Sequence, residues 1–215
     1  MTTIKLSANS LGHYNVCRRF YWYYKIMDRR LVRSSPGRIA GTAMHAGLLA
    51  FNQGKSIAEQ DAAVEKVFTA TPTPLDDYRQ ASYTKDGLAA FRAELGGVLA
   101  GWKIEETESH GEVELGQIEY RGMGAAGYEI LPARVLFEFR RDLVALSPDG
   151  LRTVWDYKTA SRNEQVEWEA AKNSGALMAY ARTYQIQHNL PVHGAYLVRL
   201  ITRKPSKSGV AFEFP

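Results

Sequence analysis

Three ionisable residues near the middle of the chain, Asp142, Asp156 and Lys158, have types and a spacing that could do chemistry together. They lie in two β-rich runs on either side of Ser-Pro-Asp-Gly at 147–150, a sequence typical of a hairpin turn. A turn centred on Asp149 pairs residues whose numbers add up to 298 and places Asp142 opposite Asp156. Two carboxylates that face each other at about 5 Å repel and weaken a sheet. The pair therefore predicts a cation between them, most simply a hard divalent ion with oxygen ligands.

Alternation along the second strand decides which of these side chains meet. Lys158 is two residues after Asp156 and shares its face, whereas Trp155 and Tyr157 point to the other side of the sheet. For a tripeptide such as Asp156-Tyr157-Lys158, a surface hairpin with scattered charges is the simpler interpretation. The matched register and apolar neighbours such as Val154 favour instead the convergence of the two aspartates and the lysine.

A histidine earlier in the chain is a candidate for the same site. His45 lies four residues after Gly41 in a predicted helix over 39–51, among small side chains that let a ligand or a backbone approach closely. Taken alone, a helical histidine is most often a packed or surface residue. A neutral imidazole is also a common metal ligand, so both interpretations stay open on these residues alone.

The elements that must position these groups are predicted from capping residues and apolar spacing. Besides the hairpin we expect helices over about 7–33, 39–51, 56–69, 83–106 and 164–188, and strands over 111–121 and 194–203. Residues 122–127 are expected to form a flexible turn. The aromatic side chains of the first helix are mostly core, but some could stack on bases beside Arg18 and Arg19.

Several of these segments resemble the PD-(D/E)XK nuclease superfamily, in its RecB-like exonuclease branch. The run Val154-Trp-Asp-Tyr-Lys-Thr159 resembles the lysine motif of the family, and Asp142 with the following turn resembles its second motif. Gly41-Thr42-x-x-His45 resembles its first motif, and the three motifs follow in the family's order. The name of the superfamily includes a Pro-Asp pair, and Pro148-Asp149 in the turn offers one, but a hairpin partner is better placed than the tip of a turn. We therefore prefer Asp142 as the acid, with Arg141 in place of the motif proline.

The resemblance implies a fold, a reaction and a set of ligands. The fold is an α/β domain with a central mixed sheet flanked by helices, the restriction-endonuclease-like core. The reaction is phosphodiester hydrolysis in DNA with Mg²⁺ or Mn²⁺, more often by an exonuclease than by an endonuclease. The metal ligands would be His45, Asp142, Asp156 and the backbone carbonyl of Tyr157, with Asp142, Asp156 and Lys158 as the catalytic residues.

Substrate contacts are implied as well, for Arg18, Arg19, Thr42, Thr159 and Tyr180. Tyr180 could match the tyrosine of the family's Gln-x-x-x-Tyr helix, although Ala176 stands at the glutamine position. Glu112 or Glu114 could add a carboxylate, but plain alternation in an exposed strand explains both.

The N-terminal segment resembles a family stretch in which a cysteine is followed by proline, and Arg18 replaces that proline here. Some relatives use this cysteine with three later ones to hold an iron–sulfur cluster. Cys17 is the one cysteine in the chain, so no iron–sulfur cluster is expected.

Composition is ordinary for a globular protein, with 215 residues, 45% hydrophobic and 23% charged. We expect a single nuclease domain over 1–215 with a helical insertion at about 56–108. The net charge of +4 permits a polyanionic partner without demonstrating one. No apolar run approaches the roughly 20 residues that span a bilayer, which predicts a cytoplasmic protein with no membrane contact.

The expected partner is DNA, in repair, recombination or phage DNA processing. A recombinase, a single-strand-binding protein, a helicase subunit or further copies of the chain are additional expected partners. Two alternatives remain. One is a catalytically inactive subunit of the same fold that binds nucleic acid or regulates a partner. The other is a protein unrelated to nucleic acids, in which Asp142, Asp156 and Lys158 form a structural ion-pair cluster.

Overall fold

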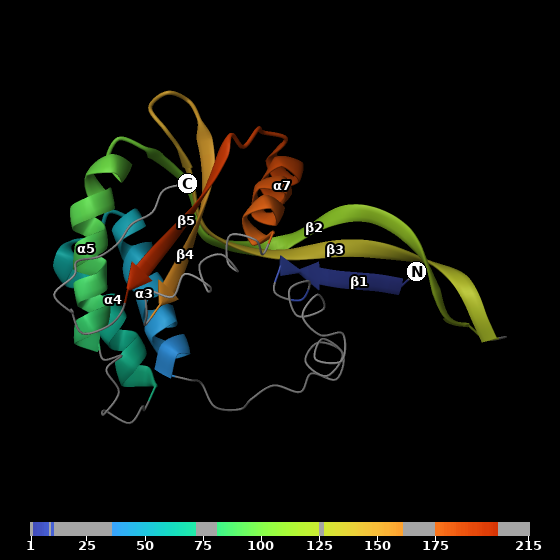
Figure 1. Ribbon diagram of the computed structural model, residues 1–215, viewed down its shortest axis with the longest axis horizontal. Coiled ribbons are helices and arrows are strands. Elements are labelled where there is room, and N and C mark those ends of the chain that lie inside the picture. The colour runs from blue at the N-terminus through green and yellow to red at the C-terminus, as the bar shows by residue number, and fades with distance from the viewer. Residues whose placement is uncertain are drawn as a thin grey trace.

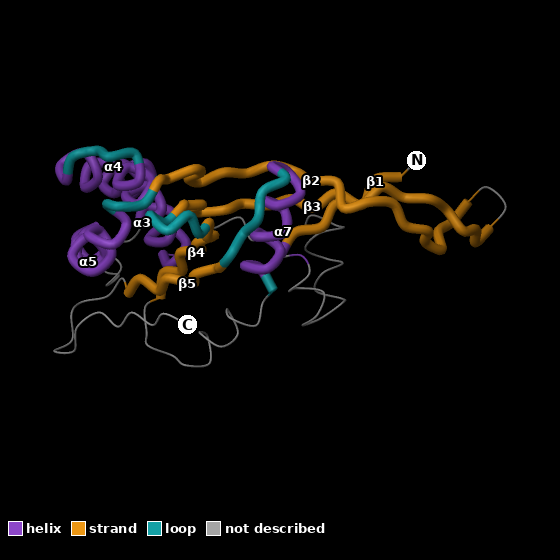
Figure 2. The backbone as a smooth tube through the Cα atoms, turned by 90° about the horizontal axis from the view of Figure 1, so that it is seen from above, coloured by secondary structure: helices purple, strands orange, loops and turns teal. Residues whose placement is uncertain are grey.

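Two long antiparallel strands, β2 (Lys103–Gly124) and β3 (Gly127–Leu146), run through the whole molecule (Figure 1). The structure is a computed structural model, and it describes residues 2–8, 10, 36–71, 81–124, 127–160 and 175–201. The distal parts of the two strands, residues 111–124 and 127–139, form a ribbon that we call the arm, and the far end of this ribbon projects from the body (Figure 2). The proximal parts enter the body and reach the predicted site.

The described strands form one mixed sheet of five, in the order β1-β3-β4-β5, with β2 on the other side of β3. β1 (Thr2–Ser7) pairs in parallel with the arm portion of β3, and β4 (Arg152–Ala160) pairs antiparallel with its body portion. β5 (Gly194–Ile201) lies parallel to β4 and completes the sheet in the body.

Helices cover both faces of the sheet. On one face, α3 (Pro36–Asn52), α4 (Ile57–Ala70) and α5 (Ala81–Leu99) pack in a core that includes Leu143, Trp155 and Tyr157. On the other face α7 (Ala176–His188) packs on Val144, Val154 and the phenylalanines of β3 (Figure 1). Consecutive residues of β4 therefore alternate between two cores, and this alternation leaves Asp156 and Lys158 on the α7 side.

The predicted hairpin register is confirmed. Leu143 pairs with Trp155, Val144 with Val154, Ala145 with Thr153 and Leu146 with Arg152, all with numbers adding up to 298. The turn closes by a bond from the Gly150 N–H to the Ser147 carbonyl at 3.0 Å, and Gly150 has φ +79. That backbone conformation favours glycine, so local turn chemistry sets the register of the strands that carry the two aspartates.

The bounds of α3 and α4 are within three residues of those predicted, and the prediction for α5 has one error at its end. The capping box of Ser56 and Glu59 begins α4 as expected, and α3 ends at Asn52, just before Gly54. The helix expected over 83–106 ends at Leu99, and residues 103–108 are strand rather than the last part of a helical insertion. Residues 103–107 pair with 143–146 of β3, so tertiary pairing explains the strand, because the local sequence has no alternation of apolar and polar residues.

The strand expected over 111–121 is also longer than predicted, and it begins at Lys103 and ends at Gly124. Residues 122–124 and 127, expected in a flexible turn, belong to the paired strands of the arm. At the N-terminus, residues 2–7 form β1, and the Ser7 Oγ accepts the Ser10 N–H at 3.2 Å, as a helix N-cap does. Most of the helix expected over 7–33, the start of that over 164–188 and residues beyond Ile201 lie outside the described residues.

None of the helices in the described ranges is long and apolar enough to cross a membrane.

Candidate active site

A cleft of about 350 Å³ opens where α3, β3, β4 and α7 meet. It brings together the histidine, both aspartates and the lysine that the sequence singled out, although they come from three separate elements. Thr42, Thr159 and Tyr180, predicted as substrate contacts, also line it. The complete lining is Gly37, Arg38, Gly41, Thr42, His45, Arg140, Asp142, Asp156, Lys158, Thr159 and Tyr180.

Asp142 lies at the point where β3 and β4 separate. Their last paired residues are Leu143 and Trp155, and one step further the Asp142 Oδ2 accepts the N–H of Tyr157 at 2.6 Å. The carboxylate thus takes over from the main chain of β3 as the partner of β4. This bond fixes the orientation of Asp142 and keeps it next to Asp156.

Glu108 on β2 is a site residue that the sequence analysis missed. The flanking pairs are Thr107 with Leu143 and Ser109 with Arg141, so Glu108 lies opposite Asp142. Glu108 has φ +47, a conformation that is uncommon for a residue other than glycine. Such a conformation costs on the order of 1–3 kcal/mol and tends to occur at functional sites.

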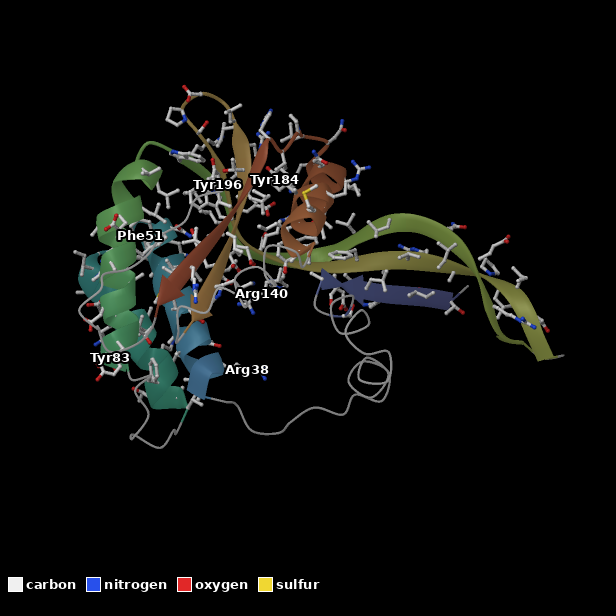
Figure 3. All side chains as sticks on the ribbon, viewed as in Figure 1. Arg38, Phe51, Tyr83, Arg140, Tyr184 and Tyr196 are labelled. Atoms are coloured by element: carbon white, nitrogen blue, oxygen red, sulfur yellow. The ribbon has the colours of Figure 1, made fainter. Side chains whose placement is uncertain are left out.

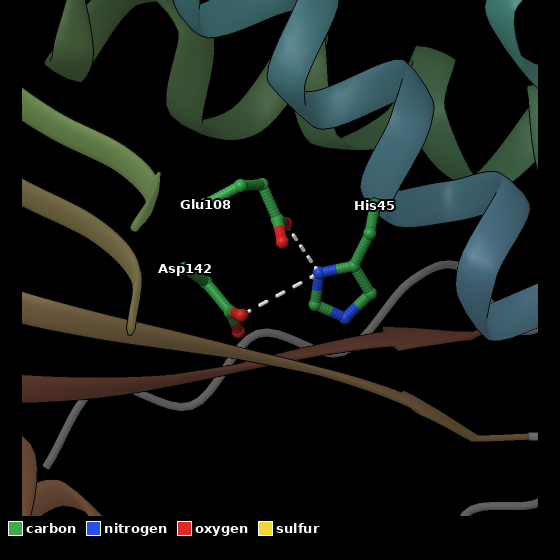
Figure 4. A group of neighbouring side chains, drawn as sticks. All are labelled: His45, Glu108 and Asp142. Carbon is green, nitrogen blue, oxygen red and sulfur yellow. Dashed lines mark hydrogen bonds and ion pairs between the residues drawn. The ribbon is translucent and has the colours of Figure 1, made fainter. Parts of the chain in front are cut away.

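His45, Glu108 and Asp142 form a compact donor group (Figure 4). The His45 Nδ1 lies 2.7 Å from the Glu108 Oε1 and 3.5 Å from the Asp142 Oδ1. One ligand atom from each residue falls within 4.8 Å of the others, close enough for all three to hold a single ion. Glu112 and Glu114 lie further out on the arm and do not line the cleft.

Burial raises the pKa of Asp142 from 3.8 to about 6, and the negative charge of Asp156 adds to this rise. Burial lowers the pKa of His45, but the bond to Glu108 and the charge of Asp142 outweigh it, so that the His45 pKa is raised overall. Burial likewise opposes ionisation of Glu108, yet His45 and Arg140 hold its pKa below the ordinary value. The centre thus gathers buried negative charge that favours a bound cation or proton.

Asp156 and Lys158 form an ion pair along β4. The Lys158 Nζ lies 2.7 Å from the Asp156 Oδ2 and donates a bond of 2.9 Å to Oδ1. Asp156 is buried, whereas the Lys158 side chain is 49% exposed and borders the cleft. The lysine therefore carries positive charge to the mouth of an otherwise acidic site.

Close contact between α3 and β4 brings His45 near the strands. A Cβ on Gly41 would lie 3.1 Å from the Thr159 Oγ1, so an alanine here would require the Thr159 side chain or the helix to shift by a few tenths of an ångström. Thr42 donates its hydroxyl to the Arg38 carbonyl at 3.0 Å within the helix. Tyr180 reaches the cleft from α7, and burial followed by the charge of Asp156 raises the pKa of its phenol.

Arg141, which stands at the position before the acid, is a structural residue. Its side chain is 0% exposed and donates from Nε to the Glu106 Oε2 at 2.9 Å and from Nη2 to the Gln187 Oε1 at 2.8 Å. The guanidinium also lies over the ring of Phe139, 3.9 Å from its centroid. These contacts hold α7 against β2 and β3, and so position the wall that carries Tyr180.

Other residues considered in the sequence analysis lie outside the described residues or away from the cleft. Arg18 and Arg19 lie outside the described residues. Ala176, at the glutamine position of the family helix, is the first residue of α7. Gln187 lies on the same helix but bonds to Arg141.

A mixed sheet that presents a histidine, several buried carboxylates and a lysine in one cleft is typical of metal-dependent hydrolytic proteins. The family model of the PD-(D/E)XK nuclease superfamily matches residues 5–212. The chain therefore belongs to the PD-(D/E)XK nuclease superfamily, and its sheet and helices form the restriction-endonuclease-like core. Membership implies a nuclease that uses divalent metal ions.

Solved structures also resemble the chain, among them the crystal structure of SSO0001. It is 13% identical, the alignment covers 88% of this chain and 78% of that one, and the TM-score is 0.27. No curated protein matches the chain.

Proposed function

We propose that the protein is a Mg²⁺- or Mn²⁺-dependent DNA nuclease of the RecB-like branch, acting as an exonuclease. The observation that carries this proposal is the donor group of His45, Glu108 and Asp142, with ligand atoms within 4.8 Å of one another. Two of its members, His45 and Asp142, line the same cleft as the Asp156–Lys158 pair. One imidazole and several carboxylates suit Mn²⁺, and a mainly oxygen ligand set suits Mg²⁺.

The residues present fit such an ion on electrostatic grounds. The raised pKa of Asp142, about 6, reflects buried carboxylates that lack enough positive charge around them. Asp156 would complete the ligand set from the adjacent strand, and Glu108 extends the set predicted from sequence. When bound, a divalent ion would offset the negative charge of the phosphate and lower the pKa of bound water.

The Tyr157 carbonyl is proposed as a further oxygen ligand. The Tyr157 N–H points from β4 toward Asp142, to which it is bonded at 2.6 Å. In an extended strand the N–H and the C=O of one residue point to the same side, so this carbonyl also faces the gap between β3 and β4.

Lys158 is proposed to hold the attacking water or the negatively charged phosphate. Its amine is anchored by Asp156 and its side chain borders the cleft, so the charge is both oriented and accessible. Thr42, Thr159 and Tyr180 would contact the substrate from the walls of the cleft. Arg18 and Arg19 remain proposed contacts on the strength of the sequence.

We place this activity in a single domain over residues 1–215, working in DNA repair, recombination or phage DNA processing. A recombinase, a single-strand-binding protein, a helicase subunit or further copies of the chain are proposed partners. The family resemblance of the motifs supports these assignments.

Digestion of end-labelled linear DNA and covalently closed circular DNA, with Mg²⁺, Mn²⁺ or EDTA, tests the proposal. We expect metal-dependent loss of the linear substrate alone, and no cleavage by Asp156→Ala. Cleavage of the closed circular DNA would indicate an endonuclease and not an exonuclease. DNA binding without cleavage in any metal would favour the inactive subunit, and neither binding nor cleavage would refute the nucleic-acid function.

A further inference from the structure

Two neighbouring arginines on β3 have opposite environments. Arg141 is completely buried, and its guanidinium donates to residues of β2 and α7. The side chain of Arg140 is 67% exposed and lines the cleft (Figure 3). Packing explains Arg141, whereas nothing about the core requires a cation at position 140.

Arg140 is held directly beside the acidic centre. Its Nη2 donates to the Glu108 Oε2 at 2.9 Å, while the other oxygen of Glu108 lies 2.7 Å from the His45 Nδ1. A guanidinium carries five N–H donors in a rigid plane, and the bond to Glu108 is made by Nη2. The group is oriented by one acid and still borders open space.

A cleft that accepts a polyanion must offset the charge of its own carboxylates. Asp142 and Asp156 line this cleft, Glu108 lies next to Asp142, and Lys158 is already paired with Asp156. Arg140 and Arg38 add positive charge from β3 and from the first turn of α3. A planar guanidinium binds the oxygens of a phosphate in pairs, which a lysine cannot do.

We propose that Arg140 binds a backbone phosphate of the nucleic-acid strand at the mouth of the cleft, next to the carboxylate group. The inference rests on the proposed function, because it names how the substrate of that same site is held. It makes Arg140 a substrate-binding residue that the sequence motifs do not identify.

Arg134 provides a matched control on the same strand. It pairs with Glu114 of β2 at 2.9 Å, the same distance as Arg140 to Glu108, and its side chain is 44% exposed. It is six residues away on the arm and does not line the cleft. The two arginines therefore differ in location while sharing a strand and a type of partner, and both side chains are exposed.

The test is equilibrium binding of a fluorescein-labelled DNA oligonucleotide, measured by anisotropy in EDTA over a range of salt concentrations. Arg140→Gln should weaken binding about tenfold, and should reduce the slope of log affinity against log salt by about one phosphate contact. Arg140→Lys should keep the slope but bind more weakly than the wild type. Arg134→Gln should match the wild type in both quantities.

Steady-state cleavage with Mg²⁺ or Mn²⁺ gives a second measurement. Arg140→Gln should raise KM about tenfold and change kcat by less than about threefold. If Arg140 only holds Glu108 in place, kcat would fall while KM and the salt slope stayed the same, and the inference would be wrong. Unchanged affinity, slope and KM in Arg140→Gln would also refute it and leave the proposed function intact. A wild type that neither binds nor cleaves DNA would refute both.

Discussion

The β2–β3 ladder is interrupted by two residues with positive φ, one in the body and one on the arm. In the body Glu108 has φ +47, and the residues on either side of it keep the same register against β3. On the arm Gly116 has φ +134 beside a bulge, where the register shifts between Glu114 and Gly116. A glycine accepts such a conformation cheaply, whereas a glutamate does not.

The difference indicates what each irregularity does. The glycine lets the arm twist and insert Leu115 without strain, because a residue without a side chain accepts a φ of +134. The glutamate keeps an unfavourable backbone and gains contacts with His45 and Arg140. Strain is thus retained at the end of the ladder that carries the site and is relieved at the end that does not.

The largest predicted difference in kcat is between variants of two lysines whose side chains are equally exposed. Lys158 pairs with Asp156 at the site and Lys5 pairs with Glu112 at the arm, and both side chains are 49% exposed. Lys158→Met should lower kcat by about 10²–10⁴-fold because it removes the group proposed to hold the water or the phosphate. Lys5→Met should leave kcat unchanged.

Cleavage rates and thermal unfolding of both variants check this contrast. If Lys158→Met cleaved DNA at the rate of the wild type, the lysine would have no part in the mechanism. An equal loss of activity in the two variants would erase the distinction between the site and the arm.

The next effect is on stability in the absence of metal. The pKa of Asp142 is about 6 in the folded protein and ordinarily 3.8. The protonated carboxyl therefore contributes to the free energy of unfolding in full below pH 3.8, and this contribution is lost as the pH rises through 6. The raised pKa of His45 acts in the same direction, with its contribution present below 6.5 and lost above the folded-state pKa. Asp142→Asn should therefore be more stable than the wild type at pH 7.5, by at most about 3 kcal/mol.

Urea unfolding in EDTA, followed by circular dichroism, measures this difference. The advantage of Asp142→Asn should shrink toward pH 4, where the wild-type carboxyl is protonated. An advantage that grows as the pH falls would contradict the assigned environment of Asp142.

A smaller effect links the two ends of the ladder. At the end of the arm the numbers of paired residues add up to 251, as for Gly124 and Gly127. The unpaired residue Leu115 lowers this sum to 250 in the part of the ladder that contains Glu108. If the ladder ran through Leu115 without this bulge, Ser109 and not Glu108 would lie opposite Asp142. Deletion of Leu115 would make the pairs Glu114–Leu136 and Gly116–Val135 consecutive and leave Glu108 in place, so that it should not change activity. Insertion of one alanine between Glu112 and Val113 would move Ser109 opposite Asp142 and should lower activity by about 10–100-fold, as expected for loss of a group that supports a metal site. Cleavage assays at saturating DNA check this, and full activity of the insertion variant would mean that the body sets its own register.

The smallest effect is expected at the glycine itself. Gly116→Ala should cost about 1–2 kcal/mol of the free energy of unfolding, because alanine disfavours a φ of +134, and it should leave cleavage unchanged. Chemical denaturation and the standard cleavage assay measure the two quantities. A loss of activity without a loss of stability would show that the arm takes part in the reaction.

The bulge also explains what could be predicted from sequence. The β3–β4 hairpin is local, and its turn residues place Asp142 and Asp156 on the strands that the structure shows. Gly41 and His45 were found because they belong to one compact motif, Gly41-Thr42-x-x-His45, on a single helix. Glu108 was not, since its place depends on pairing across more than 30 residues and on one inserted residue in an exposed arm. Glutamates also stand at 105, 106, 112 and 114, so residue type alone does not single out position 108.

Arg141 illustrates a second limit. A charged residue in place of the motif proline gives no sequence signal of burial, yet contacts from α7 and β2 satisfy its donors. Those partners are distant in the chain, so only the assembled fold shows that Arg141 is packed and that Arg140 is open to the cleft.

The most direct test of the central claim is a calorimetric titration of the metal-free protein with Mn²⁺, on the wild type, Glu108→Gln and Glu114→Gln. The two glutamates lie on the same strand, and each pairs with an arginine of β3 at 2.9 Å. We expect the wild type and Glu114→Gln to bind Mn²⁺ equally, and Glu108→Gln to bind at least about tenfold more weakly. Equal binding by all three proteins, or none by the wild type, would contradict a metal centre at the body end of the ladder.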